Sequence, residues 1–341
     1  MKRLQLRLGE KTMTELKKHI KAGEPAPLYI FHGSEAYLRE YYLKKIKELI
    51  IPAGTETFNL SVFDKRGFST QAFIEALETA PFMAEHRLVI VRDVDFFKLK
   101  DELEPIFKER WSGTTVVFSF EALEYKPDKR TKLYKLVEAF AATVEFKPQT
   151  EKDLIPWIIR RFDSLGKQID TENAQYLIFL CGRDMTTLIN EIEKIAAFAS
   201  MSEVTRRHID AVGTPTVEAV VFDLTDALAD GEPGKALELL NTLIDNREEP
   251  IMILGAIGKQ ARGLYLARLA LDAGQGRDIV MKGMGYHHPY PAEKLIRSAK
   301  RFGLERCRRA VTACQRADSE LKLGYDKLIT LERLIAEMSV C

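Results

Sequence analysis

Residues 80–91 read APFMAEHRLVIV, and this stretch decides how the first part of the chain folds. Its last four residues are apolar and mostly β-branched, a pattern typical of a strand buried on both faces of a parallel sheet. The helical pattern before it runs into Pro81, which blocks helix continuation. Phe82 and Met83 therefore lie on a turn between helix and strand. Such a pair is either an anchor for a partner's pocket or a plug that folds back under the sheet edge.

Strands and helices alternate through residues 1–147. Apolar runs predict strands at 28–31, 58–62, 88–91, 114–120 and 143–146. Helical periodicity fills the intervals, with stripes that include Leu38, Phe73, Leu103 and Leu133. Five strands separated by four helices imply a right-handed, doubly wound α/β sheet.

The loop after the first strand is the usual phosphate site of such a sheet. Here it reads His32-Gly33-Ser34-Glu35, with Ser34 expected to cap the next helix. A Walker A loop needs G-x-x-x-x-G-K-[ST], whereas this loop is short, lacks lysine and carries an acidic residue. Asp93 and Asp95 follow the third strand, where aspartates are common as turn residues. The sequence predicts a nucleotide-type fold without its nucleotide chemistry.

The rest of the chain has helical periodicity throughout. Helices are expected at 150–166, 171–181, 184–199 and 205–212, and Gly213-Thr214-Pro215 breaks the pattern. About five more helices follow. We therefore expect an α/β domain at 1–147, a small helical domain at 148–213 and an all-helical domain at 214–341.

Composition limits the function classes. The 341 residues carry a formal net charge of +1, so any contact with nucleic acid must come from a local basic patch. The chain shows no signal-like N-terminus and no apolar run of about 18 residues, so we expect no membrane contact and a cytoplasmic location. The four cysteines are scattered, and His287-His288 has no third ligand at useful spacing. We expect no metal site, no cofactor and no catalytic residues.

Several groups of residues, colinear over nearly the whole chain, together resemble one family, the delta subunit of the bacterial DNA polymerase III clamp loader. No single group is diagnostic, but the ordered set is specific. The groups are LYIFHGSE at 28–35 with Leu38, PFM at 81–83 before RLV at 87–89, DKR at 128–130, LINEIEK at 188–194, VFDLTDAL at 221–228, EPI at 249–251 and ADSELK at 317–322 with Gly324.

The resemblance implies an AAA+-like first domain without a functional P-loop, a helical lid domain and a helical collar domain for oligomerisation. It implies as partners the beta sliding clamp, the gamma or tau ATPase subunits, delta-prime and primer–template DNA, with ATP used by the partner subunits. The family's clamp-binding pair maps onto Pro81 and Phe82, with Met83 adjacent. Many relatives carry leucine where this chain has Pro81. The resemblance favours the anchor over the plug.

A basic run in the expected collar is a second candidate site. Its members are either a solvated helix face or contacts to DNA phosphates. Tyr325 is either core packing at a helix turn or a platform for an exposed base. The run comprises Lys294, Arg297, Lys300, Arg301, Arg306, Arg308, Arg309 and Arg316.

We therefore expect a non-catalytic subunit, in a family whose holoenzyme activity is DNA-directed DNA polymerase. It would bind the sliding clamp and help hold the clamp ring open for loading during DNA replication. Two alternatives stay open. A nucleotide hydrolase with a degenerate phosphate loop predicts ATP binding by the isolated chain, and a helical DNA-binding module predicts salt-sensitive DNA affinity of the isolated chain.

Overall fold

The computed structural model describes residues 13–109, 111–286 and 289–340. The chain forms two compact units, residues 1–148 and 149–341, each with its own hydrophobic core. The boundary expected near residue 213 falls inside the second unit and stays a prediction. The pair His287-His288 lies outside the described residues.

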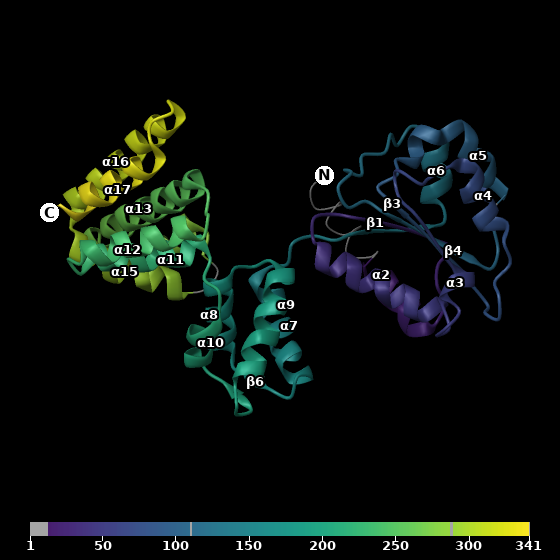
Figure 1. The fold of residues 1–341 in the computed structure, drawn as a ribbon, viewed down its shortest axis with the longest axis horizontal. Helices are drawn as coiled ribbons and strands as arrows, with labels where there is room; N and C mark the ends of the chain where they lie inside the picture. The colour runs from purple at the N-terminus through teal and green to yellow at the C-terminus, as the bar shows by residue number, and fades with distance from the viewer. Residues whose placement is uncertain (1–12, 110, 287–288, 341) are drawn as a thin grey trace. The chain divides into compact units, whose positions relative to one another are not determined.

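The first unit alternates strands with helices, as its sequence pattern predicts (Figure 1). Residues 13–22 are helical before the first strand. The elements that follow are β1 (Leu28–His32), α2 (Ala36–Ile50), α3 (Glu56–Asn59), β2 (Leu60–Phe63), α4 (Thr70–Glu78), β3 (Arg87–Arg92), η1 (Phe96–Leu99), α5 (Lys100–Glu109), β4 (Thr114–Ser119), α6 (Lys132–Glu138) and β5 (Ala141–Glu145).

The five strands form one parallel sheet in the order β2-β3-β4-β1-β5. Leu28 of β1 is opposite Val116 of β4 on one side and Ala141 of β5 on the other. Because every strand runs the same way, all the strands begin at one edge of the sheet and end at the opposite edge. The sheet therefore has an amino edge and a carboxyl edge with separate loops.

Helices cover both faces of this sheet (Figure 1). Along β1, Leu28 and Ile30 belong to the core cluster that contains residues of α4, α5 and α6. Tyr29 and Phe31, which point to the other face, belong to the cluster that contains residues of α2. A strand buried on both faces explains the continuous apolar runs in the sequence. The predicted doubly wound α/β architecture is confirmed.

Three local predictions in this unit are wrong. Phe58 lies in the one-turn helix α3, and the second strand begins only at Leu60. The last strand begins two residues early, at Ala141. Ser34 does not cap α2, because Glu35 is the N-cap residue and no side-chain cap bond forms there. Short apolar runs fit one turn of helix as well as a strand start, so the pattern alone could not separate them.

The second unit begins with four helices, at the predicted places, around a small core that includes Leu188 and Ile192. Two short strands also pair here in parallel, β6 with β7, and the sequence pattern did not predict them. Two-residue strands have no periodicity to detect. The elements are α7 (Glu151–Ser164), β6 (Gln168–Ile169), α8 (Thr171–Cys181), α9 (Met185–Phe198), β7 (Glu203–Val204) and α10 (Arg206–Val212).

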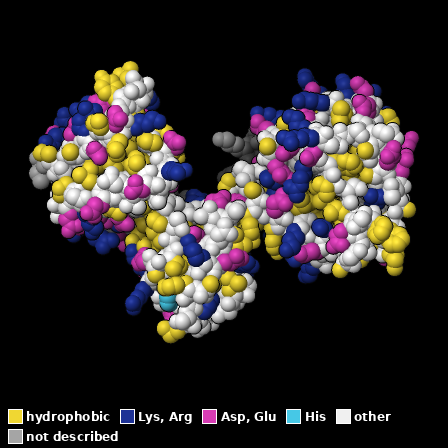
Figure 2. Space-filling model, in the orientation of Figure 1, with side chains coloured by type: hydrophobic (Ala, Val, Ile, Leu, Met, Phe, Trp, Pro, Cys, Tyr) yellow, Lys and Arg dark blue, Asp and Glu magenta, His cyan; other side chains and the backbone are white. Residues whose placement is uncertain are grey.

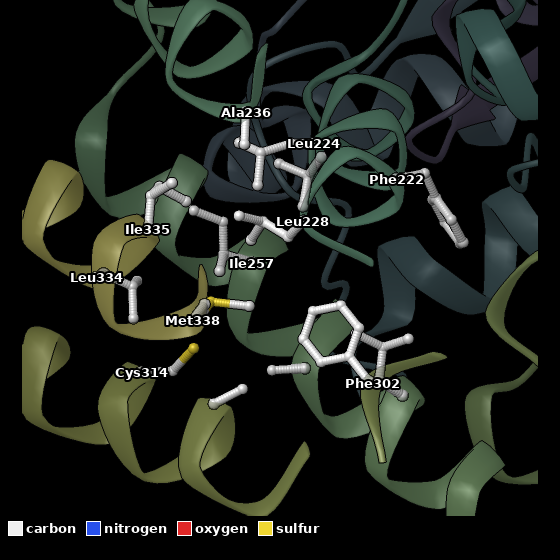
Figure 3. Close-up of a cluster of buried hydrophobic side chains, with 14 of the residues drawn as sticks. Phe222, Leu224, Leu228, Ala236, Ile257, Phe302, Cys314, Leu334, Ile335 and Met338 are labelled. Atoms are coloured by element: carbon white, nitrogen blue, oxygen red, sulfur yellow. The ribbon is translucent and has the colours of Figure 1, made fainter. Parts of the chain in front are cut away.

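Seven helices complete the described part of the second unit. The long helix α13 is buried on several sides because it packs against α11, α15 and α16. Figure 3 shows the centre of this bundle, where Leu224, Ile257 and Ile335 from three helices converge. The helices are α11 (Val217–Ala229), α12 (Pro233–Asp245), α13 (Pro250–Asp272), α14 (Arg277–Met284), α15 (Pro289–Phe302), α16 (Leu304–Lys322) and α17 (Lys327–Ser339).

The expected all-helical bundle is confirmed for the described residues 214–286 and 289–340. The helix α14 has eight residues and was not predicted, since its apolar stripe is short. Among the described residues, no helix combines the length and apolar character needed to span a membrane.

Candidate functional site

The turn between α4 and β3 carries two exposed apolar side chains. Phe82 is 49% exposed and Met83 is 81% exposed. The alternative in which they fold back as a plug therefore does not match the structure. Pro81 packs over Gly113, where an added Cβ would lie 3.4 Å from the proline ring. We call residues 80–86 the tip.

The backbone of the tip is held by a buried side chain from a distant part of the sequence. Asn59, at the end of α3, is fully buried. Its Oδ1 accepts a hydrogen bond from Phe82 N at 2.8 Å, and its Nδ2 donates to Phe82 O at 2.8 Å. The ring of Phe58 lies 4.8 Å from the ring of Phe82, centroid to centroid. Phe58 is itself 56% exposed, so two neighbouring rings face solvent.

Arg87 ties the base of the tip to three elements. Its Nη1 donates to the carbonyl of Thr79 at 3.3 Å, and its Nη2 donates to Ser61 Oγ at 2.9 Å. Its backbone N–H donates to the carbonyl of Gly113 at 2.9 Å. The side chain is buried, and this burial lowers the pKa of Arg87. The tip therefore sits on a fixed base formed by α4, β2 and the loop before β4.

These contacts place the tip at the amino edge of the sheet. Asn59 directly precedes β2, the tip precedes β3, and Gly113 precedes β4. Ligands of doubly wound sheets usually bind at the carboxyl edge. The exposed apolar rings are therefore on the edge opposite the usual ligand site.

At the carboxyl edge, the loop after β1 is closed by its own backbone. His32 O accepts from Phe146 N at 2.7 Å, and Glu35 N donates to Phe146 O at 3.0 Å. Gly33 has φ +112°, and a Cβ added there would overlap Phe146 O. The buried Arg39 donates from Nη1 to Gly33 O at 2.7 Å. A phosphate cradle needs several backbone N–H groups aimed at a ligand, and this loop uses its Glu35 N–H internally.

Asp93, beyond β3, has a structural role. One of its oxygens, Oδ1, accepts hydrogen bonds from the N–H groups of Glu121, Ala122 and Leu123 at 2.8–2.9 Å. Asp93 also has φ +54°, a conformation that aspartate tolerates better than most residues. Its interpretation as a turn residue agrees with these bonds. Within residues 13–109, 111–286 and 289–340, no group of His, Cys, Asp and Glu is arranged to hold a metal ion.

The basic run contains two residues held by partners within the chain, Lys294 and Arg306, and six exposed residues. The ammonium of Lys294 lies 2.5 Å from Asp223 Oδ1 and 3.2 Å from Asp226 Oδ2, and its side chain is only 12% exposed. Burial disfavours the charge, but these two carboxylates outweigh it and raise the pKa of Lys294. Lys294 thus fastens α15 to α11. Arg306 is buried and donates to carbonyl groups of Leu228 and Met338.

The other basic side chains of the run are exposed. Arg301 pairs with Asp230, Arg316 with Glu337, and Arg308 with Glu305. For the remaining three, no ion pair forms with any residue that the structure describes; they are Arg297, Lys300 and Arg309.

Tyr325 lies in the exposed turn between α16 and α17 and is 57% exposed, so it is not core packing. Leu323 and Ile329 beside it are 76% and 61% exposed. Figure 2 shows hydrophobic side chains gathered at this end of the helix pair. An exposed aromatic ring is compatible with stacking on a base or with contact to a protein.

Sequence reasoning missed Phe58 and Asn59. Phe58 was assigned to a strand, and its contact with the tip joins residues 23 or 24 positions apart, which no local pattern encodes.

Comparisons with known proteins agree on one family. Residues 29–147 match the family model described as DNA polymerase III, delta subunit, and residues 218–338 match that of its C-terminal domain. The DNA polymerase III subunit delta of Bacillus subtilis is 28% identical over 94% of this chain and 95% of its own length. The probable subunit of Aquifex aeolicus is 25% identical over 90% and 89%.

A solved structure agrees with these matches. The Bacillus subtilis DNA clamp loader delta protein superposes with a TM-score of 0.53 at 26% identity, covering 96% of this chain and 99% of that one. Together with the parallel sheet and the helical second unit, this likeness confirms the expected order of an α/β domain followed by helical domains, as in that delta protein. The chain belongs to the DNA polymerase III delta subunit family.

Proposed function

We propose that this chain is a clamp-loader subunit that binds the beta sliding clamp through Phe82, with Pro81 and Met83 beside it. The observation that carries the proposal is a half-exposed aromatic ring whose backbone is fixed on both sides by Asn59. Aromatic anchors of this kind carry a large share of interface energy. A relative over nearly the whole chain is described as a clamp loader delta protein.

The proposed mechanism is binding without bond-making. The tip enters a pocket of the clamp and helps hold the ring open, which requires tighter binding to the open ring than to the closed one. Residues 214–341 hold the chain in a complex with the gamma or tau ATPase subunits and delta-prime. The complex acts on primer–template DNA in the cytoplasm during replication.

We further propose that the chain uses no cofactor and that its partners hydrolyse the ATP. The support is the loop at residues 32–35, whose Glu35 N–H and Gly33 carbonyl already have partners inside the chain. A phosphate would have to displace Phe146 O before reaching the start of α2. The rival, an active nucleotide hydrolase, predicts micromolar binding of fluorescent ATP by the isolated chain, and we expect none.

For DNA, we propose Arg297, Lys300 and Arg309 as phosphate contacts in the assembled complex, with Arg301, Arg308 and Tyr325 as weaker candidates. Lys294 is left out because its charge is already neutralised by two aspartates. Charge reversal at the first three positions should lower DNA affinity of the complex and flatten its salt dependence. Strong salt-sensitive DNA binding by the isolated chain would instead favour the helical DNA-binding module.

The direct test is a titration of the full chain with purified clamp. Phe82→Ala should lower the affinity about 30-fold or more, since truncating an anchor costs about 2 kcal/mol or more. Phe198→Ala is the matched control, because Phe198 is also about half exposed, at 53%, and lies on α9. Equal affinity of Phe82→Ala and the native chain would overturn the proposal.

A further inference from the structure

We infer that the clamp-binding anchor has two rings, Phe58 and Phe82, and that Asn59 is the positioning residue that keeps Phe82 in its binding conformation. This inference rests on the proposed function and extends it to a segment more than twenty residues before the tip. It assigns to α3 a part in clamp recognition.

The two rings form one surface. Their centroids are 4.8 Å apart with planes inclined by 41°, and both side chains are about half exposed. A pocket that accepts Phe82 would therefore meet Phe58 at the same time. Two adjoining aromatic rings offer more apolar area than a single ring, and their mutual contact limits the conformations of each. The second ring thus adds contact area and also restricts the first.

Asn59 uses its whole amide group for this arrangement. Its Oδ1 accepts from Phe82 N, and its Nδ2 donates both to Phe82 O and to Thr55 Oγ1, at 3.0 Å. A reversed amide would place like groups together at Phe82, so the bonds fix its orientation. Residues 80–86 form no helix or strand, and Phe82 therefore depends on this side chain for backbone partners.

The second ring, Phe58, and the positioning residue, Asn59, are adjacent in the sequence. Phe58 and Asn59 are neighbours in the one-turn helix α3, whose N–H groups at both residues donate to Thr55 O. One turn of helix thus places a ring against Phe82 and an amide against its backbone. Fixing a binding group before association reduces the entropy lost on binding. Asn59 therefore acts on affinity through Phe82, without contacting the clamp.

The test compares single substitutions by clamp titration, together with thermal unfolding of each full-length variant. Phe58→Ala and Asn59→Ala should each lower clamp affinity about five- to tenfold, less than Phe82→Ala. Thr131→Ala is the matched control: it also removes a side-chain bond to backbone, that from Tyr134 N to the cap of α6, away from the tip. It should lower the melting temperature and leave clamp affinity unchanged.

The outcomes separate this inference from the proposed function. If Phe82→Ala weakens binding while Phe58→Ala and Asn59→Ala stay within twofold of native, the two-ring anchor is wrong and the proposed function stands. If Phe82→Ala binds as the native chain does, the proposed function fails and the inference with it. If Thr131→Ala and Asn59→Ala weaken binding equally, Asn59 has only a stabilising role. Should Asn59→Ala not fold, Asn59→Ser and the surface substitution Phe58→Ala provide the same comparison.

Discussion

The two edges of the five-stranded sheet are built in opposite ways. At the carboxyl edge, the loop after β1 is closed by hydrogen bonds between its own backbone and Phe146. At the same edge, Asp93 Oδ1 accepts hydrogen bonds from three N–H groups. At the amino edge, Asn59 pairs with the backbone N–H and carbonyl of Phe82, yet the Phe58 and Phe82 side chains are about half exposed.

This contrast indicates which edge of the sheet can still form contacts with a partner. Polar groups already paired within the chain have little to offer a ligand. The exposed rings of Phe58 and Phe82 still have apolar area to bury. Substitutions at the carboxyl edge should therefore change stability and leave clamp affinity unchanged, while substitutions at the tip should do the reverse.

The largest stability loss should follow Gly33→Ala. The residue has φ +112°, and its Cβ would overlap Phe146 O, so the free energy of unfolding should fall by about 3 kcal/mol. Gly54→Ala is the control, because Gly54 also has positive φ but an added Cβ meets nothing within 4 Å. Urea unfolding measures both, and a similar loss in the two variants would show that the loop is not tightly closed.

Asp93→Ala should cost about 2 kcal/mol, because the N–H groups of Glu121, Ala122 and Leu123 lose a charged acceptor and alanine is strained at φ +54°. Asp93→Asn keeps an oxygen acceptor and tolerates positive φ, so it should stay close to the native stability. The melting temperature of the native chain should not respond to millimolar Mg²⁺. A rise with Mg²⁺ that Asp93→Ala abolishes would instead assign a metal role to this edge.

The smallest effect should come from His32, whose ring centroid lies 4.7 Å from that of Tyr125, with the planes inclined by 32°. Burial lowers the pKa of His32 below its ordinary 6.5, and Lys147 adds to this against the opposing charge of Glu145. The unfolded chain then takes up a proton first, so the free energy of unfolding should fall as pH drops below about 6.5. Urea unfolding at pH 7.5 and 5.5 should show a smaller drop for His32→Gln. An equal drop in both proteins would show that His32 does not cause the loss of stability at low pH.

The sequence predicted the sheet well because its strands are buried on both faces and leave an unbroken apolar signature, as in residues 88–91. It also predicted an unusual apolar turn at Phe82. The partner segment at Phe58 and Asn59 escaped prediction, because its contacts span more than twenty residues and its helix has one turn. Lys294 was grouped with solvent-exposed cations, since nothing in a basic run reveals that two aspartates on another helix neutralise one member.

The central claim is that the clamp meets the amino edge of the sheet and not the carboxyl edge. A photoreactive benzoylphenylalanine placed at position 82, or at the exposed position 34, tests this directly in the presence of purified clamp. Crosslinking to the clamp from position 82 and none from position 34 is the predicted result. Crosslinking from position 34 with none from position 82 would contradict the account.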